Sequence, residues 1–254
     1  MQPKSIETCR ESIETCRVEI LNELLERYGK GGFSSLKNQF LFIRKKYAWL
    51  FIVGGANLLK RILDIIFSIV LSVLLIPLFI VVAIGIKITD GGPILFWQQR
   101  VGKWGREFPF PKFRSMTVDA EKHKKVLLSQ SHHGDSITFK MKDDPRITKI
   151  GKIIRRLSID ELPQLICILK GDMSLVGPRP ATVDEVNKYT LKDRRRLDAI
   201  PGLTCIWQVS GRGDIPFKQQ VELDVQYIQS QSFFNDIIIL FKTIPAVLTG
   251  KGAY

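Results

Sequence analysis

The chain has 254 residues, and its 38 lysine and arginine residues outnumber its 25 aspartate and glutamate residues, which gives a formal net charge of +13. This length allows one sizeable domain with appendages, and the charge predicts anionic partners. No zinc-finger, homeodomain or aromatic–basic RNA signature occurs, so we expect no nucleic acid partner; phosphorylated small molecules and an acidic membrane face remain.

Residues 1–57 are expected to form an N-terminal extension. Its first part predicts a polar helix in which Ser5–Arg10 and Ser12–Arg17 have the same sequence. The offset of seven residues puts isoleucines on one helix face, as in a homo-oligomer contact, but an accidental repeat in a surface helix explains the pattern as well and is preferred. Residues 40–59 contain an apolar run that is too short to span a bilayer, which predicts an interfacial helix.

Residues 58–88 contain the candidate membrane segment, an apolar run over residues 65–86. A span needs about 20 apolar residues, so the length suffices. Lysine and arginine residues stand on both sides of the run, which marks both flanks as cytoplasmic, and Pro77 bends the helix in its middle. We therefore predict a re-entrant helix that bends at Pro77 and returns to the face it entered. The alternative is a conventional span with a proline kink.

Residues 89–254 predict a cytosolic domain that is mixed α/β or mostly helical, and the fold class expected for the whole chain is α+β, mostly helical. Its apolar C-terminal stretch is typical of an amphipathic interfacial helix that lies on the membrane surface. The elements expected in this domain are a strand at 94–99, a strand-and-loop hairpin over 100–116, a basic helix over 149–157, a charged helix over 181–200, a loop over 201–213, a helix over 216–231 and the apolar helix over 233–248.

Two adjacent carboxylates, Asp160 and Glu161, stand where another helix is expected to begin. Pro163 fits only the first turn of a helix, and Gly171 ends it. Asp160 would then lie at the positive end of the helix dipole and near Arg155, and both effects favour its ionised form. An ionised, partly shielded aspartate can attack phosphorus and form an acyl phosphate. Glu161 points about a hundred degrees away, so it could orient Asp160, bind a metal or move a proton.

On spacing alone, an acidic helix start without a chemical role would be the better explanation of this pair. The surrounding cations weaken that explanation. Arg155 precedes the carboxylates, and the segments Gly177–Pro180 and Gly211–Gly213 follow, each with an arginine beside glycine. Backbone N–H groups and a guanidinium can hold one anion together in such segments, so we expect a phosphate site.

The order of six segments resembles one known family. The chain is similar to bacterial sugar transferases of the monotopic phosphoglycosyl transferase family (polyprenyl-phosphate hexose-1-phosphate transferases) over about residues 58–254. The segments that carry the resemblance are Lys60–Asp64, Pro111–Met116, Arg155–Gln164, Gly171–Pro180, Pro201–Thr204 and Trp207–Arg212.

The resemblance implies an enzyme that transfers a hexose-1-phosphate from a UDP-sugar to undecaprenyl phosphate and releases UMP. Such a reaction starts exopolysaccharide, capsule or O-antigen synthesis at the cytoplasmic face of the bacterial inner membrane, in contact with its phospholipid. The family mechanism is ping-pong, with a covalent aspartyl-phosphosugar intermediate. The family also has a re-entrant helix broken at a proline, which corresponds to Pro77. The region that begins at Trp207 looks closer to relatives that use glucose or galactose.

The family's motifs also assign roles to residues of this chain. By that match Asp160 is the nucleophile and Glu161 its helper, with Mg²⁺ beside them. Mg²⁺ typically takes one or two carboxylates, so Asp160, Glu161 and then Asp172 are the candidate ligands. The residues expected to bind substrate phosphates are Lys112, Arg114, Arg155, Arg179 and Arg212.

Two other functions stay open at this point. A catalytically silent membrane adaptor would use the basic face to hold acidic lipid, and a glycosyltransferase would move the sugar without its phosphate. Release of UMP would indicate the sugar-phosphate transferase, release of UDP the glycosyltransferase, and release of neither the membrane adaptor. The resemblance does not account for the N-terminal extension.

Overall fold

The computed structural model describes residues 32–118, 120, 144–250 and 252. The chain divides into two compact units, Met1–Arg61 and Ile62–Tyr254. The helix expected over residues 1–30, with its repeat, lies outside the described residues.

The apolar segment forms two helices in succession, α2 (Gly32–Leu74) and α3 (Ile76–Asp90), with Leu75 between them. Pro77 lies in the first turn of α3, where its missing N–H removes no helical hydrogen bond. No single described helix is long and apolar enough to cross a membrane. The parts Asn57–Leu74 and Ile76–Asp90 pass that test only as a pair, bent by 59°. The predicted bend is therefore present, two residues before Pro77.

Helix α2 is longer than the sequence predicts. It begins at Gly32 and runs without a break through the expected interfacial helix at 40–59 and through the expected boundary between residues 57 and 58. No proline interrupts this stretch, and the pair Gly54-Gly55 lies within the helix without ending it, so the backbone hydrogen bonds continue from one predicted element into the next.

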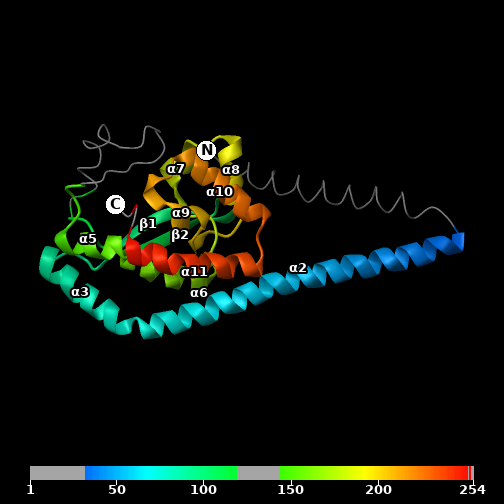
Figure 1. The fold of residues 1–254 in the computed structure, drawn as a ribbon, viewed down its shortest axis with the longest axis horizontal. Helices are drawn as coiled ribbons and strands as arrows, with labels where there is room; N and C mark the ends of the chain where they lie inside the picture. The colour runs from blue at the N-terminus through cyan, green and yellow to red at the C-terminus, as the bar shows by residue number, and fades with distance from the viewer. Residues whose placement is uncertain (1–31, 119, 121–143, 251, 253–254) are drawn as a thin grey trace. The chain divides into compact units, whose positions relative to one another are not determined.

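The remaining chain forms many short elements around two small sheets, which agrees with the predicted α+β class (Figure 1). The strands are β1 (Leu95–Val101), β2 (Glu107–Phe113), β3 (Ser174–Val176), β4 (Ala181–Thr182) and β5 (Gly202–Thr204). The α-helices are α5 (Lys149–Arg156), α6 (Leu165–Lys170), α7 (Val183–Asn187), α8 (Leu191–Arg194), α9 (Ile206–Ser210), α10 (Phe217–Gln229) and α11 (Phe233–Thr249), and the 3₁₀ turns are η1 (Lys103–Gly105), η3 (Ile159–Gln164), η4 (Arg195–Leu197) and η5 (Arg212–Asp214).

The larger sheet contains a hairpin, but it begins earlier than the one predicted over 100–116, because the strand expected at 94–99 is its first arm. Strands β1 and β2 pair antiparallel from Leu95 opposite Phe113 to Val101 opposite Glu107. Strand β4 pairs antiparallel with the other edge of β1, so the order is β2-β1-β4. The smaller sheet joins β3 and β5 in parallel. The register of the hairpin fixes which side chains of β2 reach the site described below.

The charged helix predicted over 181–200 is wrong. Strand β4 opens this region, and α7, α8 and η4 follow as separate short helices. Two capping boxes explain the division, because Thr182 with Glu185 and Thr190 with Asp193 each begin a new helix by bonding its first N–H groups. The loop predicted over 201–213 is also more ordered than expected, since β5, α9 and η5 occupy it.

One hydrophobic core connects the hairpin to the C-terminal helices. It contains aromatic residues of β2 together with residues of α6, β3, α10 and α11. Tyr227 is fully buried in it and donates its hydroxyl to the Val176 carbonyl at 2.9 Å, which ties α10 to β3. Asp64 of α2 is also buried and accepts the Leu175 N–H at 3.0 Å. Helix α11 packs against α9, β3 and β5 (Figure 1). Short elements are thus fixed around one rigid centre.

Candidate active site

A cavity of about 1220 Å³ lies within residues 62–254, and it is lined by the two carboxylates and the five cations that the sequence assigned to catalysis and phosphate binding. These residues are Lys112, Arg114, Arg155, Asp160, Glu161, Arg179 and Arg212. They come from β2, the loop after it, α5, η3, the loop before β4 and η5. The fold therefore brings together groups that are up to a hundred residues apart in the chain.

The two carboxylates are placed by a sharp reversal of the chain. Helix α5 ends at Arg156, and Ser158 then adopts a left-handed φ of 54° before η3 begins. The helix expected from Asp160 to Lys170 is present as η3 followed by α6, and Gly171 ends it with a φ of 94°. Its first turns are 3₁₀ and not α. The reversal directs the N-terminal end of η3, with its carboxylates, toward the cavity.

Glu161 is held by two cations. Lys112 donates to its Oε1 at 3.0 Å, and Arg179 donates to Oε2 at 3.0 Å and to Oε1 through its other nitrogen. Burial alone would raise the pKa of Glu161, but Arg179 and Lys112 outweigh it and hold that pKa well below its usual range. Glu161 in turn raises the pKa of Arg179, although burial acts to lower it. Glu161 is therefore a permanent anion that orients two cations.

Asp160 is in the opposite situation. Its side chain is 7% exposed, and no described residue donates a hydrogen bond to its carboxylate. Burial raises its pKa from 3.8 to about 6; the charge of Glu161 adds to this, whereas Lys112, Arg155 and Arg179 oppose it. The expectation that Arg155 and the helix dipole dominate is thus wrong in sign, because desolvation is the larger effect. At pH 7 about nine tenths of such a group is still ionised.

The cavity is compatible with a magnesium ion held by few protein ligands. No group of three His, Cys, Asp or Glu side chains suited to a metal occurs among the described residues. Asp172 does not line the cavity; it lies beyond α6 and pairs with Arg106 at 3.7 Å. Both oxygens of Glu161 already bind cations, so within the adjacent pair Asp160 is the carboxylate that is available to bind a metal. Mg²⁺ commonly binds through one or two carboxylates plus substrate phosphates, and Asp160 fits that pattern.

Two of the predicted phosphate-binding arginines have a buried nitrogen atom without a partner among the described residues. One Nη atom of Arg114 and one of Arg212 are buried, and neither has a hydrogen-bond acceptor among the residues that the structure describes. Buried guanidinium nitrogens are normally paired, so such atoms at a cavity wall are suited to an anion. Burial lowers the pKa of Arg212, while the charges of Glu161 and Asp160 oppose this.

Arg100 belongs to the same site, and sequence reasoning missed it. It lines the cavity, and its guanidinium donates to the Pro180 carbonyl at 3.1 Å and to the Gln98 side chain at 2.8 Å. Burial lowers its pKa to about 10. The pairing of β1 with β4 puts Arg100 beside Thr182, and no local sequence signal predicts that pairing. Arg100 therefore fixes the segment that follows Arg179.

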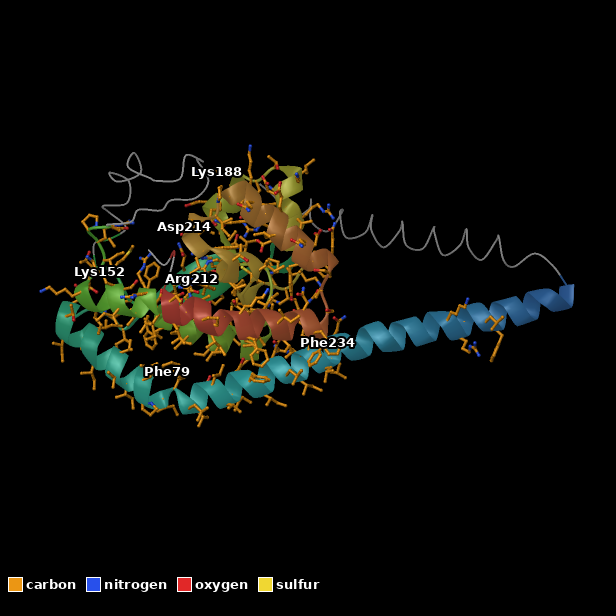
Figure 2. All side chains as sticks on the ribbon, in the orientation of Figure 1. Phe79, Lys152, Lys188, Arg212, Asp214 and Phe234 are labelled. Atoms are coloured by element: carbon orange, nitrogen blue, oxygen red, sulfur yellow. The ribbon has the colours of Figure 1, made fainter. Side chains whose placement is uncertain are left out.

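The other end of the cavity is apolar. Leucine and isoleucine side chains from α2, β3, β5 and α11 line it, namely Leu71, Leu175, Leu203, Leu240, Ile244 and Leu248. Figure 2 shows Arg212 beside the C-terminal end of α11, so the polar and apolar parts of the cavity meet near that helix. A ligand with a charged head and an apolar chain suits this division.

The family model described as bacterial sugar transferase matches residues 55–250, and the chain belongs to that family.

Three relatives illustrate the range of similarity. The galactosyl transferase CpsE of Streptococcus agalactiae is 57% identical over 165 residues, which cover 65% of this chain and 36% of that protein. The undecaprenyl-phosphate galactose phosphotransferase of Salmonella typhimurium is 45% identical over 208 residues, which cover 79% of this chain and 42% of that protein. The exopolysaccharide production protein ExoY of Sinorhizobium fredii is 39% identical over 80% of this chain and 90% of its own. The chain thus spans less than half the length of the first two relatives.

Proposed function

We propose that the protein is a phosphoglycosyl transferase that moves a hexose-1-phosphate from a UDP-sugar to undecaprenyl phosphate. The observation that carries this proposal is the inequality of the two carboxylates. Glu161 is held between Lys112 and Arg179, while the Asp160 carboxylate lacks a hydrogen-bond partner among the described residues and lines the cavity. An aspartate that is ionised, desolvated and surrounded by arginines is suited to attack a phosphate.

In the first step, a carboxylate oxygen of Asp160 attacks the phosphorus that bears the sugar. The bond from that phosphorus to the bridging oxygen breaks, and UMP leaves with the bridging oxygen and its electron pair. The product on the protein is an aspartyl-phosphosugar. The negative charge that develops on the leaving phosphate needs fixed cations, and the guanidinium groups of Arg114 and Arg212 have nitrogens available for it.

In the second step, a phosphate oxygen of the lipid acceptor attacks the same phosphorus and releases the Asp160 carboxylate unchanged. The lipid diphosphate sugar is the product. The apolar end of the cavity, with Leu240 and Ile244 of α11, suits the first units of a polyprenyl chain, while the cations of the polar end suit its phosphate. Donor and acceptor then use one aspartate in turn, which is a ping-pong mechanism.

Asp160 together with substrate phosphate oxygens would hold a magnesium ion. When bound, Mg²⁺ supplies charge neutralisation on the two phosphates. Glu161 does not need to bind the metal for this mechanism, because its role is to orient Lys112 and Arg179.

The proposed location is the cytoplasmic face of a bacterial inner membrane. The bent pair formed by the end of α2 and by α3 passes the test for a membrane segment by length and composition. Ile88 of α3 is 81% exposed, and Phe234 and Phe241 of α11 are 77% and 70% exposed. Large apolar side chains on two neighbouring surfaces favour lipid as their surroundings. A helix that enters the bilayer and returns would leave the cavity at the membrane surface, where a polyprenyl phosphate can reach it.

Incubation of the purified protein with a UDP-sugar and undecaprenyl phosphate tests the proposal. Because two relatives are named for galactose, UDP-galactose is the first donor to use, followed by UDP-glucose. Release of UMP with formation of a lipid diphosphate sugar is the expected result. Release of UDP would indicate a glycosyltransferase, and turnover of neither donor, with binding to anionic vesicles alone, would favour a membrane adaptor.

A further inference from the structure

The loop that carries Arg212 has an unusual backbone conformation. Arg212 has a φ of 51°, which is in the left-handed region that a residue with a side chain rarely adopts. Such a conformation persists only where the surrounding structure fixes it, and it is frequent at functional sites. One Nη atom of this arginine is buried without a partner among the described residues, so its position is set by the loop and not by a contact of that atom.

Gly252 contacts this loop from beyond the end of α11. Its carbonyl accepts a hydrogen bond from the Gly213 N–H at 3.0 Å, and Gly252 itself lines the cavity together with Arg212. Helix α11 ends at Thr249 with Gly250 as its C-cap, and the end of α11 lies beside Arg212 in Figure 2. A residue near the end of the described chain therefore touches the site directly.

The contact leaves no room for a side chain. A Cβ atom on Gly252 would lie 2.5 Å from the Gly211 carbonyl oxygen and 3.2 Å from the Arg212 Cβ. Gly252 also has a φ of 67°, which glycine adopts without strain. Both the backbone conformation and the close approach thus require glycine at this position.

We propose that Gly252 is a positioning residue that holds the Arg212 loop in its left-handed conformation and so aims the Arg212 guanidinium at a substrate phosphate. The inference rests on the proposed function, in which Arg212 binds that phosphate. Donors that stabilise a developing charge must be fixed before the reaction, and a displacement of about 1 Å can cost on the order of a hundredfold in rate. Gly252 acts through Arg212 and does not touch the reacting atoms.

A double-mutant cycle with Gly252→Ala and Arg212→Ala tests the proposal in the full-length protein, with UDP-galactose, undecaprenyl phosphate and Mg²⁺. Gly252→Ala is expected to lower kcat/KM for the donor by about 10- to 100-fold. In the Arg212→Ala background the same change should alter kcat/KM by less than about twofold, because the group it positions is already gone. A residue with only a general structural role would lower activity in both backgrounds.

Gly91→Ala is the matched control. Gly91 has a φ of 64°, nearly that of Gly252, but a Cβ there meets no atom within 4 Å. It therefore reproduces the backbone strain without the contact, and we expect it to keep full activity. Gly252→Asn keeps the Cβ contact but tolerates a positive φ, so it repeats the cycle with less backbone strain than the alanine variant.

The outcomes separate the two proposals. Equal losses in Gly252→Ala and Gly91→Ala, an unchanged Gly252→Ala activity, or a loss of the same size in the Arg212→Ala background would each overturn the positioning role. If the native protein releases no UMP at all, the proposed transferase function is refuted. If Arg212→Ala is fully active, Arg212 does not bind the substrate phosphate, and the positioning role of Gly252 is refuted with it.

Discussion

Replacing Asp160 with asparagine should abolish sugar-phosphate transfer and at the same time make the folded protein more stable. Burial raises the pKa of this carboxyl from 3.8 to about 6, so the folded state binds a proton more tightly than the unfolded state does. An ionised Asp160 therefore opposes folding at neutral pH. The rise in pKa corresponds to about 3 kcal/mol of stability lost at pH 7.

The sign of the pH dependence follows from the same shift. Between about pH 4 and pH 6 the unfolded chain has released this proton and the folded chain has kept it, so stability falls as the pH rises through that window. The asparagine side chain of the variant carries no proton to lose. We expect Asp160→Asn to raise the midpoint of thermal unfolding by about 6 °C at pH 7.5 and by progressively less as the pH falls toward 4.

Glu161→Gln provides the matched comparison, because it changes the neighbouring carboxylate in the same way. Glu161 has a lowered pKa and binds Lys112 and Arg179, so its charge stabilises the fold above the pKa of the unfolded chain. Removing it leaves two half-buried cations unpaired and should cost about 3 kcal/mol. Asp198→Asn, at an exposed position, should change neither stability nor activity.

Thermal unfolding of the three variants and UMP release under the same conditions are the required assays. Opposite shifts of the unfolding midpoint for Asp160→Asn and Glu161→Gln are expected. A destabilised Asp160→Asn variant would contradict the desolvation of Asp160, and a variant that still transfers sugar phosphate would refute its role as nucleophile.

Three further predictions concern the reaction itself. The exchange of labelled UMP into UDP-galactose needs only the first step. Because Asp160 must be ionised to attack, this exchange should be about tenfold slower at pH 5 than at pH 7. An exchange rate that stays constant down to pH 5 would contradict the raised pKa of Asp160. Ile244→Gln should raise KM for undecaprenyl phosphate about tenfold and leave the UMP exchange unchanged. Ile238→Gln, on α11 but outside the cavity, should alter neither the KM nor the exchange. An equal effect of the two substitutions on KM would place the lipid chain elsewhere. Arg100→Lys should keep the thermal midpoint within a few degrees but lower kcat, since Lys lacks the planar fork in which two nitrogens bond Pro180 and Gln98 separately. An unchanged kcat would exclude Arg100 from the site.

Local sequence signals were sufficient for much of the fold. The helices α5, α10 and α11 were each expected near their observed positions, and a hairpin was expected from the composition of 100–116, although it begins at Leu95. Pro163 and Gly171 delimited the helix that carries the two carboxylates, because one fits only a first turn and the other takes a left-handed φ of 94°. Such features depend on neighbours in the chain and can be read without knowing the tertiary structure.

Features that depend on distant pairing could not be predicted in this way. Strands β3 and β5 have three residues each, too few for a periodic signal, and they exist because Ser174 lies opposite Gly202 in the folded chain. Arg100 enters the site only through the pairing of β1 with β4. The charged stretch after Pro180 looked like one helix because its composition is uniform, whereas its capping boxes divide it.

The sequence placed the candidate residues close together but did not predict the electrostatics around them. The seven residues assigned from the sequence all line one cavity. The sequence did not show that Lys112 and Arg179 would bind Glu161 and leave Asp160 without a partner among the described residues, or that burial would outweigh the nearby cations at Asp160. Burial is a property of the whole fold, so no local pattern reveals it.

Trapping the covalent intermediate tests the central claim most directly. The protein is incubated with UDP-galactose and Mg²⁺ without acceptor, quenched in acid and digested with trypsin, which releases the peptide Leu157–Lys170 with both carboxylates. We predict that this peptide gains the mass of one hexose phosphate, that fragmentation assigns the gain to Asp160 and not to Glu161, and that undecaprenyl phosphate removes it. A peptide without added mass while UMP is released, or a gain on Glu161, would contradict the account.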